Sequence, residues 1–159
     1  MKTGTASILL KTVLIFCAVV LLLVVLGGVP GYMSHVTNVR PDLSGWALPM
    51  ELYGGLISLP VFAAIALLWM VFGTIAENNA FCAENARRFM LIERLAILDL
   101  GLVAVLWGFL LIVGIMPGFI LLCLSGATFV GGVAIIVFRV LAALVQNAAS
   151  LRQENELTI

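Results

Sequence analysis

The residues best suited to chemistry in this sequence are three charged ones in apolar surroundings, Glu93, Asp99 and Arg139. Between Asp99 and Arg139 runs a long stretch, Leu100 to Phe138, that contains no charged side chain. A charge at the edge of so apolar a stretch marks a candidate site for a proton, an ion or a ligand, and it calls for a partner of opposite charge.

Depth along the helices indicates which of these charges can pair. Asp99 and Glu93 lie 18 and 24 residues before Pro117. Arg139 lies 22 residues after it. If the chain turns at Pro117, a rise of about 1.5 Å per residue places Arg139 between the two acids in depth, roughly 3–6 Å from each. We expect an Arg139–Asp99 or an Arg139–Glu93 pair that clips two neighbouring helices together. The alternatives for Asp99 are a proton or ligand role, or a side chain that reaches out to the headgroups.

Motifs for catalysis and for metal binding are missing from the sequence. His35 is the only histidine, and the three cysteines, Cys17, Cys82 and Cys123, form no CxxC pair. The motifs GxSxG and HExxH do not occur, and neither does a Walker loop. We therefore expect no metal site, no cofactor and no enzymatic activity.

The composition indicates what kind of protein must position these residues. Hydrophobic residues make up 64% of the 159 positions and charged residues 10%, and the mean hydropathy is +1.24. A soluble domain is about 45–50% apolar and about 25% charged, so a soluble globule and a disordered chain are excluded. The net charge of +0 leaves no basic face for direct nucleic-acid binding. The sequence predicts an all-α membrane protein whose first partner is the lipid bilayer.

The charge-free stretches of the chain accommodate four membrane-spanning helices, since each needs about 20 apolar residues. Pro117-Gly118 is a turn signal that divides the last stretch into two spans. We expect two antiparallel hairpins in one membrane domain, 1–159, with a first helix that is retained rather than cleaved as a signal peptide. The predicted helices are 8–29, 50–76, 94–115 and 119–145, with an outer loop at 30–48, a cytoplasmic segment at 77–93 and a cytoplasmic tail at 146–159.

The positions of lysine and arginine predict the orientation. With four spans, both termini share one side of the membrane, and seven of the eight basic residues fall on that side: Lys2, Lys11, Arg87, Arg88, Arg94, Arg139 and Arg152. Only Arg40 falls on the other side. Because basic loops stay in the cytoplasm, we expect a multi-pass protein of the inner (plasma) membrane with both termini cytoplasmic.

Two segments predict helical structure on the cytoplasmic side. Residues 77–93 contain no proline or glycine and are expected to form an interfacial helix or an extension of the third span. The fourth span continues as an apolar stripe of Val137, Leu141, Leu144, Ala148 and Leu151. Such a stripe must cover headgroups, the 77–93 segment or a partner. Small residues at helix-packing spacing, such as Thr128 and Gly132, favour packing within the bundle, with a homodimer as the alternative.

Two segments resemble motifs of a known family. Residues 81–88 contain Phe81, Glu84, Asn85 and Arg88 in an F-x-x-E-N-x-x-R pattern, and residues 151–159 end the chain as L-R-Q-E-N-E-L-T-I. With four spans in 159 residues, the chain resembles the YoaS-like (DUF2975-type) family of bacterial membrane proteins. The resemblance implies four inner-membrane helices, no assigned activity and no catalytic residues. It also implies a neighbouring gene for a small helix-turn-helix regulator, and hence that regulator as a cytoplasmic partner.

Two functions follow as hypotheses. The first is a regulatory or scaffolding membrane protein that holds a soluble partner on its cytoplasmic face. The residues expected to dock the partner are Phe81, Glu84, Asn85, Arg87, Arg88, Glu154, Asn155, Glu156, Leu157, Thr158 and Ile159. The second is a small transporter or channel subunit that uses Asp99 and Arg139.

Overall fold

The computed structural model describes residues 3–77, 79–114 and 117–157 of the chain, and these residues form helices joined by short connections. The first rod consists of α1 (Thr3–Leu23), a π-helical turn η1 (Val24–Gly28) and α2 (Val29–Val39). A 3₁₀ segment η2 (Pro41–Trp46) leads into α3 (Ala47–Ala76). The chain then continues as α4 (Ala83–Val113) and α5 (Gly118–Leu157). The described residues contain no strand.

Four helical segments are long and apolar enough to cross a membrane. They are Gly4–Val39, Pro41–Ala76, Ala83–Val113 and Gly118–Leu151. At about 1.5 Å per residue, even α4 with its 31 residues is longer than the roughly 30 Å of a bilayer's hydrocarbon core. Most of the large apolar side chains on these helices are exposed, as lipid-facing side chains are. The chain is therefore a multi-pass membrane protein.

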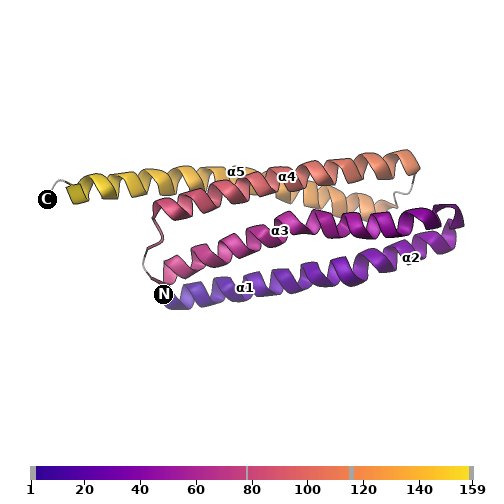
Figure 1. Cartoon of the computed structure of the whole chain (residues 1–159), viewed down its shortest axis with the longest axis horizontal. Helices are drawn as coiled ribbons and strands as arrows, with labels where there is room; N and C mark the ends of the chain where they lie inside the picture. The colour runs from indigo at the N-terminus through magenta and orange to yellow at the C-terminus, as the bar shows by residue number, and fades with distance from the viewer. Residues whose placement is uncertain (1–2, 78, 115–116, 158–159) are drawn as a thin grey trace.

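The helices lie side by side along the long axis of the molecule, and successive rods run in opposite directions (Figure 1). Both termini lie at one end, together with the α3–α4 connection, and we refer to it as the termini end. The far end carries α2, η2 and the α4–α5 connection. Within the described ranges, backbones approach within 8 Å only between α1 or α2 and α3, between α3 and α4, and between α4 and α5, apart from contacts around η1 and η2. The helices thus form a row in chain order.

A buried apolar cluster joins α4 to both α3 and α5 at the termini end. Val71 of α3, Phe89 and Ile92 of α4, and Val145 of α5 belong to one buried cluster. The rings of Phe89 and Phe138 stack with their centroids 6.1 Å apart, which fixes α5 against α4. This cluster positions the charged side chains of the same region.

Polar contacts at the same end join α1 to α3. The Ser7 hydroxyl donates a hydrogen bond to the Phe72 carbonyl, with an oxygen–oxygen distance of 2.5 Å. The Lys11 ammonium lies 5.1 Å from the centre of the Trp69 ring, within the range of a cation–π contact. The Ser7 hydrogen bond and the Lys11 cation–π contact together attach the first span to α3.

The expected outer loop at 30–48 is wrong for most of its length. Helix α2 continues to Val39, and η2 begins only two residues later at Pro41. Pro41 occupies the first turn of η2, where the missing N–H has no helical partner to lose. Pro30 directly follows the π-helical turn η1 inside one continuous rod, and such local π-helical adjustments let a membrane helix continue past a proline. The loop is therefore reduced to Arg40 and the tight turn of η2.

The helices at the termini end extend beyond their expected bounds. Helix α4 begins at Ala83 rather than at 94, so most of the 77–93 segment is the first part of that helix. Helix α5 runs as far as Leu157 rather than ending at 145, because no proline or glycine occurs between residues 133 and 157 to interrupt it. At the far end, α4 closes with Gly114 at φ 70°, a left-handed conformation that glycine adopts without strain. Residue 116, directly before the expected Pro117-Gly118 turn, is outside the described residues, as is residue 115.

Candidate functional site

An ion pair between Glu93 and Arg139 joins α4 to α5. The Arg139 Nε donates to the Glu93 Oε1 at 2.8 Å. The carboxylate is the buried member, with 12% of its side chain exposed against 73% for Arg139. Of the two pairs expected from the sequence, the structure contains Arg139–Glu93, and it places the guanidinium on the surface of the helix pair.

The register of the two helices explains this choice of partner. A Cβ on Gly131 of α5 would lie 3.4 Å from the Leu100 Cδ1 of α4, so these two residues are level. Since the helices are antiparallel, Arg139, eight residues after Gly131, is level with the residue eight before Leu100, next to Glu93. Asp99 lies about 9 Å further toward the far end, six residues of helix away, and is too deep for the same guanidinium.

Asp99 stands apart from the ion pair. Its Oδ1 is buried and has no hydrogen-bond partner among the residues that the structure describes. Two hydrogen bonds between α3 and α4 lie on either side of it: Asn85 to Thr74, and the Tyr53 hydroxyl to the Leu102 carbonyl at 2.9 Å. Fourteen residues, or two heptads, separate Asn85 from Asp99, so the carboxyl lies near the α4 face that packs on α3.

The segment of α3 at that depth is itself irregular in its hydrogen bonding. Counting from the Asn85–Thr74 contact, Asp99 is level with about residue 60 of α3. Pro60 lies inside α3 and is buried, as is Ser58. Proline has no N–H, so the Leu56 carbonyl loses its helical donor. A buried carboxyl and a freed carbonyl therefore occur at the same depth in the membrane.

Asn85 is the centre of a hydrogen-bond network that closes the α3–α4 connection. It is fully buried, at 0% exposure. Its Nδ2 donates to the Thr74 Oγ1 at 2.7 Å and to the Ala80 carbonyl at 2.9 Å. Its Oδ1 accepts a hydrogen bond from the Arg88 Nη1 at 2.9 Å, and the Arg88 Nη2 binds Glu84. The E-N-x-x-R motif is therefore an internal brace that ties the start of α4 to the end of α3.

This network corrects the expected docking surface. Asn85 cannot contact a partner because its amide is enclosed, and only 15% of the Arg88 side chain is exposed. Phe81 is 59% exposed, Arg87 is exposed and the Glu84 side chain is 69% exposed, so these three remain accessible. Sequence reasoning missed Thr74, although a hydroxyl two residues before the end of an apolar helix was a signal for a buried partner.

The expected docking residues of the tail lie at the very end of α5. Glu154, Asn155, Glu156 and Leu157 belong to its last helical turns. Thr158 and Ile159 are outside the described residues. By the Leu100–Gly131 register, Ala83 at the start of α4 is level with about residue 148 of α5. The remaining turns of α5 therefore extend past α4, and Leu151 at their start is 61% exposed.

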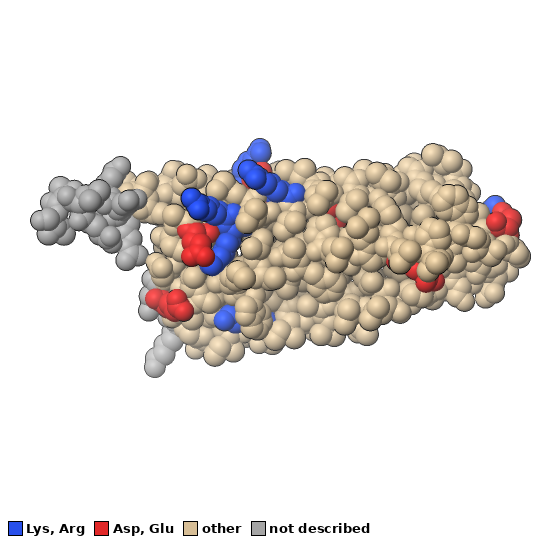
Figure 2. All heavy atoms as spheres, in the orientation of Figure 1, with Lys and Arg blue, Asp and Glu red and all other residues tan. Residues whose placement is uncertain are grey.

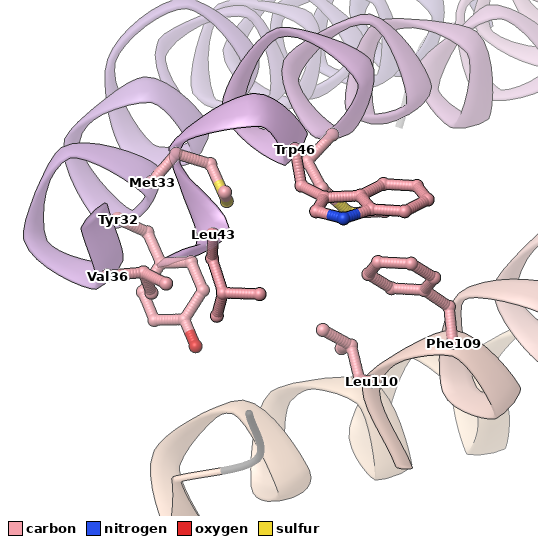
Figure 3. A pocket seen from close by; sticks show the side chains of 8 residues that line it. Tyr32, Met33, Val36, Leu43, Trp46, Phe109 and Leu110 are labelled. Atoms are coloured by element: carbon pink, nitrogen blue, oxygen red, sulfur yellow. The ribbon is translucent and has the colours of Figure 1, made fainter. Parts of the chain in front are cut away.

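The far end holds a small apolar pocket (Figure 3). Met33 and Leu43, from α2 and η2, face Phe109 and Leu110 of α4 across it. The space open to the centre of a water-sized sphere is about 10 Å³, roughly enough for one water molecule. Trp46 packs on Phe109 with ring centroids 5.1 Å apart.

Charge is distributed unevenly along the molecule (Figure 2). Basic side chains gather over α4 and α5 toward the termini end, and the band that follows them shows tan atoms with scattered acidic ones and no basic side chain until the far end. At the far end, exposed Arg40 forms a 2.9 Å ion pair with Asp42. The hydrogen bond from Arg40 to that carboxylate raises the pKa of the guanidinium further above its usual value.

The comparisons with known proteins give a family and no function. A family model described as "Protein of unknown function (DUF2975)" matches residues 31–159. The chain belongs to this family. The DUF2975 match contains α3, α4, α5 and the whole Asn85 network, which confirms the expected resemblance at the level of the family. No curated protein and no solved structure matches the chain.

Proposed function

We propose that the protein is a regulatory or scaffolding protein of the bacterial plasma membrane, without catalytic activity, whose termini end faces the cytoplasm and engages a soluble partner. The observation that carries this proposal is the length of α5. It continues to Leu157, about two and a half turns past the level of Ala83, where its neighbour α4 begins. By the Leu100–Gly131 register, these last turns have no part of α4 beside them within the described residues.

The distribution of basic residues supports the orientation. Lys11, Arg87, Arg94 and Arg139 belong to helical segments near the termini end, whereas Arg40 lies at the far end. Basic residues next to membrane spans are retained on the cytoplasmic side during insertion. We therefore infer that both termini and the α3–α4 connection are cytoplasmic. The four spans then form two antiparallel hairpins, and the end of α5 is a helical extension into the cytoplasm.

The chemistry of this end suits a protein partner. Leu151 presents an exposed apolar side chain on the projecting helix, and Phe81 presents another on the α3–α4 connection. Apolar residues on an uncovered helix are the usual anchors for a groove on a binding partner. Arg87 and Glu84 add exposed charges of both signs nearby. A small helix-turn-helix regulator, which the family resemblance implies, is the partner we propose.

Recovery of the partner from solubilised membranes tests this function. The full chain and a chain that lacks residues 154–159 are compared as bait for the neighbouring helix-turn-helix protein. We expect truncation to abolish recovery, and Leu151→Asp to reduce it. Trp46→Ala, a change at the far end, is the control and should leave recovery unchanged. Equal recovery with the full and truncated chains would refute docking on the tail.

A second candidate function rests on Asp99. Its buried and unpartnered oxygen makes a small transporter or channel subunit worth testing. Because Arg139 pairs with Glu93, this function depends on Asp99 alone among the charges first considered. Flux of protons or monovalent cations into proteoliposomes should then fall on Asp99→Asn. Flux at the level of empty liposomes for both variants would exclude transport.

A further inference from the structure

Arg139 has more hydrogen-bond donors than the protein satisfies. A guanidinium carries five N–H donors, and the only bond that the structure shows for this one runs from Nε to Glu93. The side chain is 73% exposed on a part of α5 whose neighbouring residues are apolar. Ile136 and Val140, on either side of it, are 66% and 52% exposed. Within the described residues, the remaining donors of Arg139 therefore have no acceptor.

Two further arginines lie on α4 near the level of this guanidinium. Arg94 directly follows Glu93, and Arg87 lies two turns earlier on the same face, about 10 Å away along the axis. Both are exposed, and neither forms an ion pair within the part of the chain that the structure describes. Arg88, by contrast, is neutralised by Glu84. Three arginines and the single Glu93 carboxylate leave a local charge of about +2 at neutral pH. Basic side chains gather over α4 and α5 in this region (Figure 2).

The depth of this group matches the headgroup layer. Glu93 lies twenty residues before Val113, where α4 ends, so the two are about 30 Å apart along the helix. That is the thickness of a bilayer's hydrocarbon core. Arg139 lies twenty-one residues after Gly118, where α5 begins, which places it at the same level. If the far ends of both helices reach one boundary of the core, the arginines reach the other.

We propose that Arg94 and Arg139 form a binding site for the phosphate of an anionic phospholipid in the leaflet at the termini end. Guanidinium groups bind phosphate oxygens through paired, charge-assisted hydrogen bonds. Glu93 is a positioning residue that holds Arg139 by one nitrogen and leaves the others free. Arg87 adds long-range attraction. A zwitterionic lipid fits less well because its ammonium group adds a positive charge to a site that already carries an excess.

Lipid retention by the purified full chain tests this site. Native mass spectrometry counts the phosphatidylglycerol or phosphatidylcholine molecules that stay bound as each is titrated into the detergent solution. We expect the protein to retain phosphatidylglycerol in preference to phosphatidylcholine. Combining Arg94→Gln with Arg139→Lys should weaken phosphatidylglycerol binding about tenfold, since each arginine near an anionic headgroup contributes to the attraction. The lysine keeps a cation for Glu93, so the fold is maintained.

The control is Arg40→Gln, which removes the same charge at the far end and should not change retention. Arg94→Gln alone, at a residue with no partner in the structure, should weaken binding by a smaller factor. Equal retention of the two lipids, or an unchanged affinity in the double variant, would overturn the proposal. So would an equal loss in Arg40→Gln. Displacement of phosphatidylglycerol by millimolar inorganic phosphate would assign the site to free phosphate instead of lipid.

Discussion

The side-chain amide of Asn85 donates a hydrogen bond to the Thr74 hydroxyl across 2.7 Å, and so joins the first turn of α4 to the last turn of α3. The same amide group also binds the Ala80 carbonyl and Arg88, so every polar atom of the side chain is used. An asparagine with this many internal partners specifies how two membrane helices meet. The motif that contains it is therefore explained by structure before any partner is invoked.

Asn85→Ala is expected to destabilise the protein. The change removes the hydrogen bonds that the Ala80 carbonyl, the Thr74 hydroxyl and the Arg88 guanidinium make with this buried side chain, at a cost of about 2 kcal/mol. Unfolding by sodium dodecyl sulfate in mixed micelles, followed by circular dichroism, measures this cost. Arg87→Ala, two residues away and exposed, is the matched control and should change stability by less than about 0.5 kcal/mol.

The Glu93–Arg139 pair should show coupling in a double-mutant cycle. Arg139→Gln leaves a nearly buried carboxylate unpaired, which we expect to cost about 1–2 kcal/mol, at the low end for buried pairs because the arginine is exposed. Adding Glu93→Gln should restore part of the loss. The measurement is the free energy of unfolding in mixed micelles of each single variant and of the double variant. Strictly additive costs would show that the pair does not couple α4 to α5.

Asp99→Asn is expected to leave stability unchanged or to raise it. The buried Oδ1 makes no hydrogen bond that the substitution could break, and an uncharged amide is less costly to bury than a carboxylate. The free energy of unfolding in mixed micelles should therefore stay within about 0.5 kcal/mol of the parent value or increase. A clear loss of stability would mean that the carboxylate has a partner of its own, such as a bound cation.

Gly114→Ala is expected to lower stability by about 1 kcal/mol, because φ is 70° at this residue and alanine is strained in that conformation. The thermal midpoint in detergent reports the effect. Gly126→Ala, within α5 and with open space around its Cα, is the matched control. It should be neutral or stabilising, since alanine favours a helix. The same loss in both variants would show that the left-handed conformation is not the cause.

The four spans could be predicted from the sequence because they depend on one strong physical effect. A helix that crosses a bilayer must be apolar over about 20 residues, and the charges of this chain leave room for four such stretches. The ends of the helices could not be predicted in the same way. A proline such as Pro41 is compatible with a break and with a helix start, and only the neighbouring structure decides between the two.

The partner of Arg139 was beyond sequence reasoning for a geometric reason. Glu93 and Asp99 lie on either side of it in depth, and the choice between them depends on a shift of a few ångströms between α4 and α5. That shift is set by side-chain contacts such as Leu100 against Gly131. The spacing of residues along the sequence does not predict such contacts. Asn85 was misinterpreted for another reason. A polar, charged motif between two spans looks accessible to solvent, and its burial follows only from the short connection that folds it over the end of α3.

The row of helices has a consequence for how the protein is made. Each span touches the one that precedes it in the chain, and within the described residues no backbone contact joins α1 to α4 or α5. Each helix after the first can therefore pack against the preceding span as soon as it enters the membrane, without waiting for a later segment. Assembly can proceed in the order of synthesis, one pair at a time, and a chain interrupted after α3 already contains all the contacts that its first two spans will ever make with each other.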